Sequence, residues 1–200
     1  MEVNVADDAR VAIFPYDDDA DAAFEAVCRD NPTMRVEQKP TGEIIVLSPA
    51  GNESSNRNTH ITSQLQVWNA RDQRGVVFDS NTVFRLPDAS KLGPDTAWVS
   101  KQRLRQFPRR ERKKFLSIVP EFIIELRSET DRLPDLQSKM LDWMTNGVEL
   151  GWLIEADARE VWVYEGLDVK HIIDPVCVIG TGPVAGFELV MADIYTGLDF

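Results

Sequence analysis

The sequence predicts an α/β (α+β) sandwich in which mixed strands surround two main helices. Two longer segments, at about 54–74 and 133–146, carry apolar residues at the spacing of one helix face. Short apolar runs rich in β-branched and aromatic residues, bounded by glycine or proline, are typical of strands and occupy most of the remaining chain. No internal repeat or long linker divides the 200 residues. We therefore expect a single domain over residues 1–200, with a core at about 34–195 and loose order at 1–17.

The first third of the chain predicts a short helix, a hairpin and the first long helix. Residues 17–32 begin with acids, which favour the positive end of a helix, and stop at a proline. Residues 34–49 read as two strands joined at the Pro40-Thr41-Gly42 turn. The helix at about 54–74 would end at Gly75.

The remainder alternates short strands with the second long helix, which Gly147 would stop. A basic segment at 101–114 is expected to be helical, with an interruption at Pro108. The expected strands are 76–80 paired with 82–86, then 94–99, then 121–127, then a hairpin that turns at 157–159, and short strands in the tail.

The charge of the chain is uneven. The formal net charge of −11 argues against generic binding of nucleic acid, because phosphates repel an acidic surface. Residues 101–114 nevertheless hold eight basic residues and one acid, a net of +7, so the remainder carries −18. The segment is either a solvated charged helix or a local patch that contacts phosphates, with Arg109, Arg110 and Lys113 as candidates.

Several classes of protein are disfavoured. No apolar run reaches the roughly 18 residues that a membrane helix needs, and the N-terminus lacks the basic and apolar regions of a secretory signal. The two cysteines, Cys28 and Cys177, are expected to be reduced thiols in a cytoplasmic protein. With only two histidines, a zinc site is not expected.

Two carboxylates interrupt apolar strands. Strand periodicity places Glu125 on one face with Arg127, and Asp95 on one face with Ala97 and Val99. A buried ionised acid needs a partner cation, which is either a side chain such as Arg127 or a metal ion. If the strands are neighbours, two carboxylates about 4 Å apart repel by roughly 4 kcal/mol at an effective dielectric constant of 20, and a divalent cation reverses that sign.

Two further charged residues have two interpretations each. Lys139 lies at the edge of the apolar stripe of its helix, where it either extends to water or neutralises charge that develops on a phosphate. Glu37 shares a strand face with Arg35 and Lys39 and forms either a surface ladder of charges or an oxygen ligand for a metal.

The order of these segments carries a resemblance. GPDTAWVS, then PEFIIELRS, then the helix with Lys139, then NGVELGWLIEADAREVWVYEG, closely resembles the Uma-type putative restriction endonucleases of the PD-(D/E)XK nuclease superfamily. The N-terminal stretch RVEQKPTGEIIVLSPAG also resembles the acid-bearing strand and glycine turn of that family. The similarity covers roughly Met34 to Tyr195.

This resemblance implies a restriction-endonuclease-like core, a mixed central sheet flanked by helices with acids clustered at one end and added hairpins. Asp95 matches the PD aspartate, Glu125 the acid of the (D/E)XK strand, and Glu37 the acid of the N-terminal strand. Arg127 stands where many members have lysine, and it differs because arginine keeps its proton. Lys139 matches the lysine that this family carries on the following helix.

The implied activity is metal-dependent hydrolysis of DNA phosphodiester bonds, with Mg²⁺ (or Mn²⁺) held by Asp95, Glu125 and Glu37. Lys139 would orient the attacking water, and Arg127 would be a second cation that contacts phosphate. DNA is the expected partner, no membrane is expected, and a homodimer is implied because such cores often cut as pairs. Two alternatives stay open: a catalytically silent nucleic-acid-binding module that keeps the fold, and a structural domain in which the acids pair with arginines.

Overall fold

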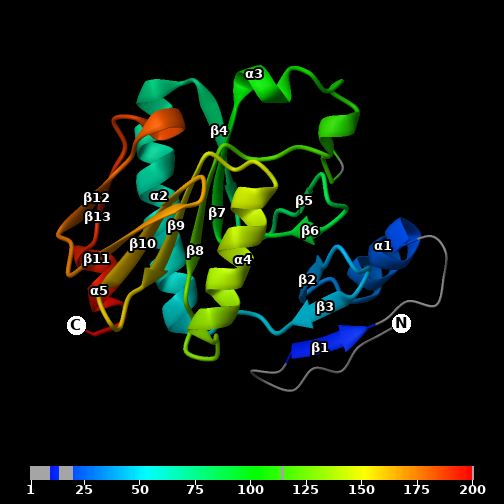
Figure 1. The fold of residues 1–200 in the computed structure, drawn as a ribbon, viewed down its shortest axis with the longest axis horizontal. Coiled ribbons are helices and arrows are strands. Elements are labelled where there is room, and N and C mark those ends of the chain that lie inside the picture. The colour runs from blue at the N-terminus through cyan, green and yellow to red at the C-terminus, as the bar shows by residue number, and fades with distance from the viewer. Residues whose placement is uncertain (1–9, 14–19, 114, 200) are drawn as a thin grey trace.

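A six-stranded mixed sheet forms the centre of the protein, in the strand order β11-β10-β9-β8-β7-β4 (Figure 1). The computed structural model describes residues 10–13, 20–113 and 115–199. Strands β8 and β9 run parallel, and the other neighbours in this sheet are antiparallel. The strands are β4 (Gly75–Asp79), β7 (Thr96–Ser100), β8 (Phe122–Leu126), β9 (Leu150–Glu155), β10 (Glu160–Glu165) and β11 (Asp168–Ile173).

One long helix covers each face of this sheet: α2 (Asn52–Asp72) lies behind it and α4 (Leu133–Thr145) lies in front (Figure 1). The alternation of side chains along β8 explains this arrangement. Phe122 and Ile124 pack with Ile61 of α2, whereas Ile123 packs with Met140 of α4. Both faces of β8 are therefore buried, which is why its sequence is a nearly continuous apolar run.

A second sheet lies beside the first, in the order β1-β3-β2-β6-β5 (Figure 1). Helix α1 packs on it through Phe24 and Val27, which contact Val36, Ile44 and Val46. Between β6 and β7 the chain crosses from one sheet to the other. The elements are β1 (Arg10–Ile13), α1 (Ala20–Asp30), β2 (Arg35–Gln38), β3 (Ile44–Leu47), β5 (Phe84–Arg85) and β6 (Lys91–Leu92).

The remaining elements are short. They are α3 (Lys101–Leu104), the 3₁₀ helix η1 (Glu111–Lys113), β12 (Cys177–Ile179), the 3₁₀ helix η2 (Gly182–Val184), β13 (Glu188–Val190) and α5 (Ala192–Thr196). Strands β12 and β13 pair with each other, and their buried residues join α5 in the core on the α2 side of the central sheet. No helix in the described part of the chain is both long and apolar enough to cross a membrane.

The predicted fold class is confirmed, and most elements lie where the periodicity placed them. The expected hairpin is β9 with β10, and Gly42 adopts a φ of 87° in the first predicted turn. Cys28 and Cys177 are free thiols, as expected.

Two expectations around residue 75 were wrong. Helix α2 ends at Asp72 and is capped by Gln73 in the left-handed conformation, and Gly75 instead opens β4. A Cβ at Gly75 would lie 2.1 Å from the Trp98 ring, so this glycine is needed for close packing rather than for ending a helix. Strand β4 pairs with β7 and not with residues 82–86, of which Phe84 and Arg85 pair with β6. The chain leaves the central sheet between these two runs, which local periodicity does not reveal.

The basic segment and the N-terminus also differ from expectation. Only 101–104 and 111–113 of the basic segment are helical among its described residues, since Pro108 lacks an amide N–H and the neighbouring cations repel one another. Lys114 lies outside the described residues. Within the segment expected to be loosely ordered, 1–17, Arg10–Ile13 form β1 and pair with β3; residues 1–9 and 14–17 lie outside the described residues.

Candidate active site

Asp95 and Glu125 meet because β7 and β8 are antiparallel neighbours. Thr96 pairs with Ile124, so one step further along the two strands Asp95 stands opposite Glu125. The backbone N–H of Leu126 donates to Asp95 Oδ2 over 2.8 Å and holds this carboxylate against β8. The two acids therefore lie side by side at one end of the strand pair.

Glu125 is 1% exposed and lies on the sheet face that α4 covers. Trp143 Nε1 donates to Glu125 Oε1 over 2.9 Å, and Lys139 Nζ lies 2.9 Å from the same oxygen. Lys139 and Trp143 are four residues apart, so the geometry of α4 presents both on one face. Burial of Glu125 is thus accompanied by a cation and a neutral donor from the same helix.

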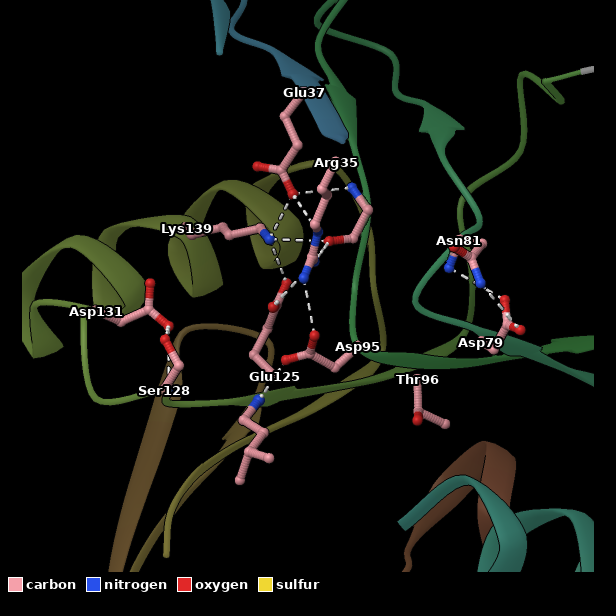
Figure 2. A network of polar contacts seen from close by, with 12 residues as sticks. Arg35, Glu37, Asp79, Asn81, Asp95, Thr96, Glu125, Ser128, Asp131 and Lys139 are labelled. Carbon is pink, nitrogen blue, oxygen red and sulfur yellow. Dashed lines mark hydrogen bonds and ion pairs between the residues drawn. The ribbon is translucent and has the colours of Figure 1, made fainter. Parts of the chain in front are cut away.

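Glu37 reaches the cluster from the second sheet (Figure 2). Its Oε1 accepts from Lys139 Nζ over 2.8 Å and from the Gly93 backbone N–H over 3.3 Å. Lys139 Nζ also donates to the Gly93 carbonyl oxygen over 2.9 Å. The three N–H donors of the Lys139 ammonium group therefore face Glu37, Glu125 and Gly93, which ties α4, β8 and β2 together.

Arg35 is the residue of this cluster that sequence reasoning missed. Its Nη1 donates to Asp95 Oδ1 over 2.8 Å, and its Nη2 donates to the Gly93 carbonyl oxygen and lies 3.7 Å from Glu125 Oε2. Its Nε lies 3.5 Å from Glu37 Oε1. Figure 2 places the guanidinium between the carboxylates of the two sheets. Its position two residues before Glu37, on the same strand face, was visible in the sequence but indicated a surface ladder equally well.

The pKa values of Glu125, Glu37 and Lys139 are shifted in different ways by their surroundings. Burial, together with the nearby Asp95 charge, raises the pKa of Glu125 to about 7 although Lys139 lowers it. Burial also raises the pKa of Glu37, but Lys139 and Arg35 outweigh it and hold that pKa below its ordinary value. Burial lowers the pKa of Lys139, yet the Glu125 and Glu37 charges raise it overall, so Lys139 is a cation at neutral pH.

The donor set fits a hard divalent cation, because carboxylate oxygens are the ligands that Mg²⁺ and Mn²⁺ prefer. Three carboxylates and two cationic side chains leave a formal charge of −1 when all are ionised. As the side chains stand, no group of three His, Cys, Asp or Glu residues in the described part of the chain is arranged to hold a metal. The facing oxygens point instead to Arg35 and Lys139.

A polar pocket of about 300 Å³ opens beside Asp95. One wall is the hydroxyl- and amide-bearing face of α2, including Asn58, Thr59 and Thr62, and the other contains Asp79 from the end of β4. Thr62 Oγ1 lies 2.6 Å from Thr96 Oγ1 and links α2 to the start of β7. The acid cluster is therefore buried under α4 but borders a hollow on the side of Asp95.

The other sequence candidates lie outside this cluster. The Arg127 guanidinium pairs with Glu155 of β9, and its Nε donates to the Asp131 carbonyl oxygen over 3.0 Å. The exposed candidates for phosphate contact are Arg109, Arg110 and Lys113. They follow α3, which begins at the end of β7 opposite Asp95 (Figure 1).

Comparison with known proteins identifies the family and a solved structure of similar fold. The family model described as "Uma2: Putative restriction endonuclease" matches residues 21–174. A solved structure of similar fold is the "putative nuclease belonging to DUF820 from Anabaena variabilis ATCC 29413", with a TM-score of 0.68 and 21% identity, covering 82% of this chain and 90% of that chain. No curated protein matches the chain. The chain belongs to the Uma2 family of putative restriction endonucleases.

Proposed function

We propose that this protein is an endonuclease that hydrolyses DNA phosphodiester bonds with a divalent cation, Mg²⁺ or Mn²⁺, held by Asp95 and Glu125 and assisted by Glu37. The observation that carries this proposal is the meeting of Asp95 and Glu125, thirty positions apart, beside Lys139 in a largely buried cluster. Membership of the Uma2 family agrees with it. When bound, such an ion acts as a Lewis acid, which makes water a better nucleophile and polarises the phosphate.

Lys139 would act as a hydrogen-bond donor and a fixed positive charge. Its raised pKa keeps it protonated at neutral pH, so it is unsuited to be a general base. A cation held at this position stabilises negative charge that develops on the phosphate as the bond to the attacking water forms. In the same proposal, Glu125 and Glu37 orient Lys139 through the 2.9 Å and 2.8 Å contacts with its Nζ.

The DNA backbone would approach through the pocket beside Asp95, whose hydroxyl and amide side chains from α2 suit phosphate and sugar oxygens. Arg109, Arg110 and Lys113 would contact phosphates farther along the duplex without reading the base sequence. Strand β7 spans about 16 Å between the two ends at the usual rise per residue, so one bound duplex can reach both.

A second candidate is a nucleic-acid-binding module without catalysis. It is favoured by the two side-chain cations, because Arg35 and Lys139 already neutralise most of the charge of the three carboxylates. A module of this kind would bind DNA through its basic segment and would not need a metal ion.

Cleavage of plasmid and single-stranded DNA, with Mg²⁺, Mn²⁺ or EDTA, separates the two candidates. The wild type should nick DNA with metal and not with EDTA, and Asp95→Ala and Glu125→Ala should abolish nicking while circular dichroism confirms folding. DNA binding that survives both substitutions, with no metal-dependent nicking by the wild type, would establish the silent module instead.

The proposal also includes a homodimer as the cutting unit, because two active sites are needed to cut both strands of a duplex at once. Light scattering with and without duplex DNA measures this. A monomer in both conditions that still makes double-strand breaks would remove the dimer from the proposal.

A further inference from the structure

We infer that Arg35 is a built-in counter-ion that occupies the place of a divalent cation, so that ion binding and the contacts of Arg35 with the carboxylates exclude each other. This inference rests on the proposed function, because it concerns the same acids. Arg35 would thereby set how tightly the site binds a metal ion.

The position of Arg35 is the first support. Its guanidinium faces all three carboxylates, at 2.8 Å from Asp95, 3.7 Å from Glu125 and 3.5 Å from Glu37. A cation that bridges Glu37, Asp95 and Glu125 would need this same central position, since their oxygens already point to it. A guanidinium carries a planar fork of donors and cannot share that space with an ion.

The quality of its contacts is the second support. Arg35 donates to Asp95 and to the Gly93 carbonyl oxygen, but its separations from Glu125 and Glu37 exceed normal hydrogen-bond lengths, and its Nε is buried without a hydrogen-bond partner. Lys139, by contrast, faces three acceptors within 2.9 Å. The Arg35 side chain also keeps 23% of its surface exposed, against 15% for Lys139. Arg35 is therefore the cation that can leave, and Lys139 the one that stays.

Charge balance is the third support. With both side-chain cations present, the three carboxylates leave a formal charge of −1. If Arg35 withdraws and a divalent cation takes its place beside Lys139, the formal charge becomes zero. If Arg35 remained, three cations would crowd three acids with a net positive charge in a buried site, which is unfavourable.

The test is the dissociation constant of Mn²⁺ alone, measured by isothermal titration calorimetry on the wild type and on Arg35→Gln. Glutamine keeps much of the side-chain length but removes the charge, so Arg35→Gln should bind Mn²⁺ at least tenfold more tightly. Arg103→Gln is the matched control, because Arg103 is also a half-buried arginine paired with a buried glutamate, and it should bind Mn²⁺ as the wild type does. A folded Arg35→Gln whose affinity is equal to or weaker than that of the wild type overturns the inference.

A measurement on the wild type covers the case in which Arg35→Gln does not fold. The ¹⁵Nε resonances of the arginine side chains are followed while Mg²⁺ is added, and the Arg35 signal is assigned by its absence in Arg35→Lys. Saturation with Mg²⁺ should shift the Arg35 signal and leave the Arg103 signal in place. If Mg²⁺ binds and the Arg35 signal does not change, the inference is overturned.

These outcomes separate the inference from the proposed function. Equal Mn²⁺ affinity in the two proteins, together with metal-dependent cleavage, overturns the role of Arg35 and leaves the nuclease standing. Tighter Mn²⁺ binding by Arg35→Gln without any cleavage by the wild type upholds the role of Arg35 and removes the catalysis. If neither protein binds Mn²⁺, both the role of Arg35 and the metal site are overturned.

Discussion

The strand pair β7–β8 has a buried glutamate near each end, and the surroundings of the two differ. Near the start of β8, Glu121 accepts from the Ser100 backbone N–H over 3.0 Å and pairs with Arg103 Nε at 3.1 Å. Arg103 also pairs with Glu149, whose side chain is 51% exposed. At the other end, Glu125 is enclosed by α4 and the second sheet.

The difference lies in the number of acids and in their access to water. Around Arg103, one arginine serves two glutamates, and water reaches the second glutamate and the arginine. Around Arg35, three acids that are each less than a tenth exposed share two cations, Arg35 and Lys139, and of these acids only Asp95 lines the polar pocket. An arginine paired with a glutamate at the end of a strand therefore does not by itself indicate a functional site. An excess of buried acids over cations supports one.

The largest effect expected is on cleavage. Asp95→Asn keeps the shape of the side chain but removes a charged oxygen donor, so metal-dependent nicking should fall on the order of 10³-fold. Glu121→Gln makes the same kind of change at the other end and should cut within about threefold of the wild type, as measured by plasmid-nicking rates. Equal losses in the two variants would mean that the two ends do not differ in function.

The second effect is on stability. Lys139→Met leaves Glu37 and Glu125 short of a buried cation, and the free energy of unfolding should fall by about 3–5 kcal/mol. Arg103→Met should cost about 1–2 kcal/mol, because water can solvate Glu149 and Glu121 keeps the Ser100 N–H as a donor. Urea unfolding at pH 7 measures both; a larger loss for Arg103→Met would reverse the comparison.

The third effect is the dependence of stability on pH. Between the ordinary pKa of Glu125, 4.5, and its raised value of about 7, the folded protein binds more protons at this group than the unfolded chain does. The contribution of Glu125 to the free energy of unfolding therefore falls as pH rises through this window, by up to about 3 kcal/mol at 1.4 kcal/mol per pKa unit. Glu37, whose pKa is lowered, adds pH dependence only below its ordinary value of 4.5, where its contribution to stability is lost as pH falls.

Urea unfolding from pH 5 to pH 8 on the wild type, Glu125→Gln and Glu121→Gln tests this sign. The fall in stability should be present in the wild type and in Glu121→Gln and absent in Glu125→Gln. If Glu125→Gln loses stability as steeply as the wild type, then Glu125 does not titrate in this range.

The smallest effect is on DNA affinity. Replacement of Arg109, Arg110 and Lys113 by glutamine should weaken duplex binding about tenfold at low salt and reduce the slope of log affinity against log salt by up to about 2.7, at 0.9 per lost phosphate contact. Fluorescence anisotropy at several salt concentrations measures this. The affinity for Mn²⁺ should not change, because these residues lie at the other end of β7. An unchanged salt slope would mean that the segment is only a solvated loop.

Much of this arrangement follows from local pattern. The alternation along β8 assigned Glu125 to one face and Phe122 to the other. In the structure Phe122 packs on the α2 side of the sheet, and Glu125 meets Trp143 of α4 on the other side. The helical spacing placed Lys139 at the border of the apolar stripe of α4, which is where it meets both Glu37 and Glu125. Periodicity is readable in these segments because each is long enough to repeat and has a buried face.

Other features depended on contacts between distant segments. The pairing of β4 with β7 rather than with its sequence neighbour, and the packing of Gly75 against Trp98, have no local signature. Arg35 belongs to the same class, because its partners Asp95 and Glu125 lie 60 and 90 positions away. Arg35, Glu37 and Lys39 share one face of the first predicted strand, and such a face of opposite charges can be exposed to water or can form a buried cluster.

By itself, then, the order of residues determined the fold class, the face of each main element and the acids at stake, because side-chain direction repeats every two residues in a strand and every 3.6 in a helix. Only the tertiary structure decided which cation balances those acids. Burial makes an unpaired charge costly, but it does not specify whether the compensating charge comes from two residues away or from another sheet. Here it comes from Lys139 on α4 and from Arg35 on the second sheet.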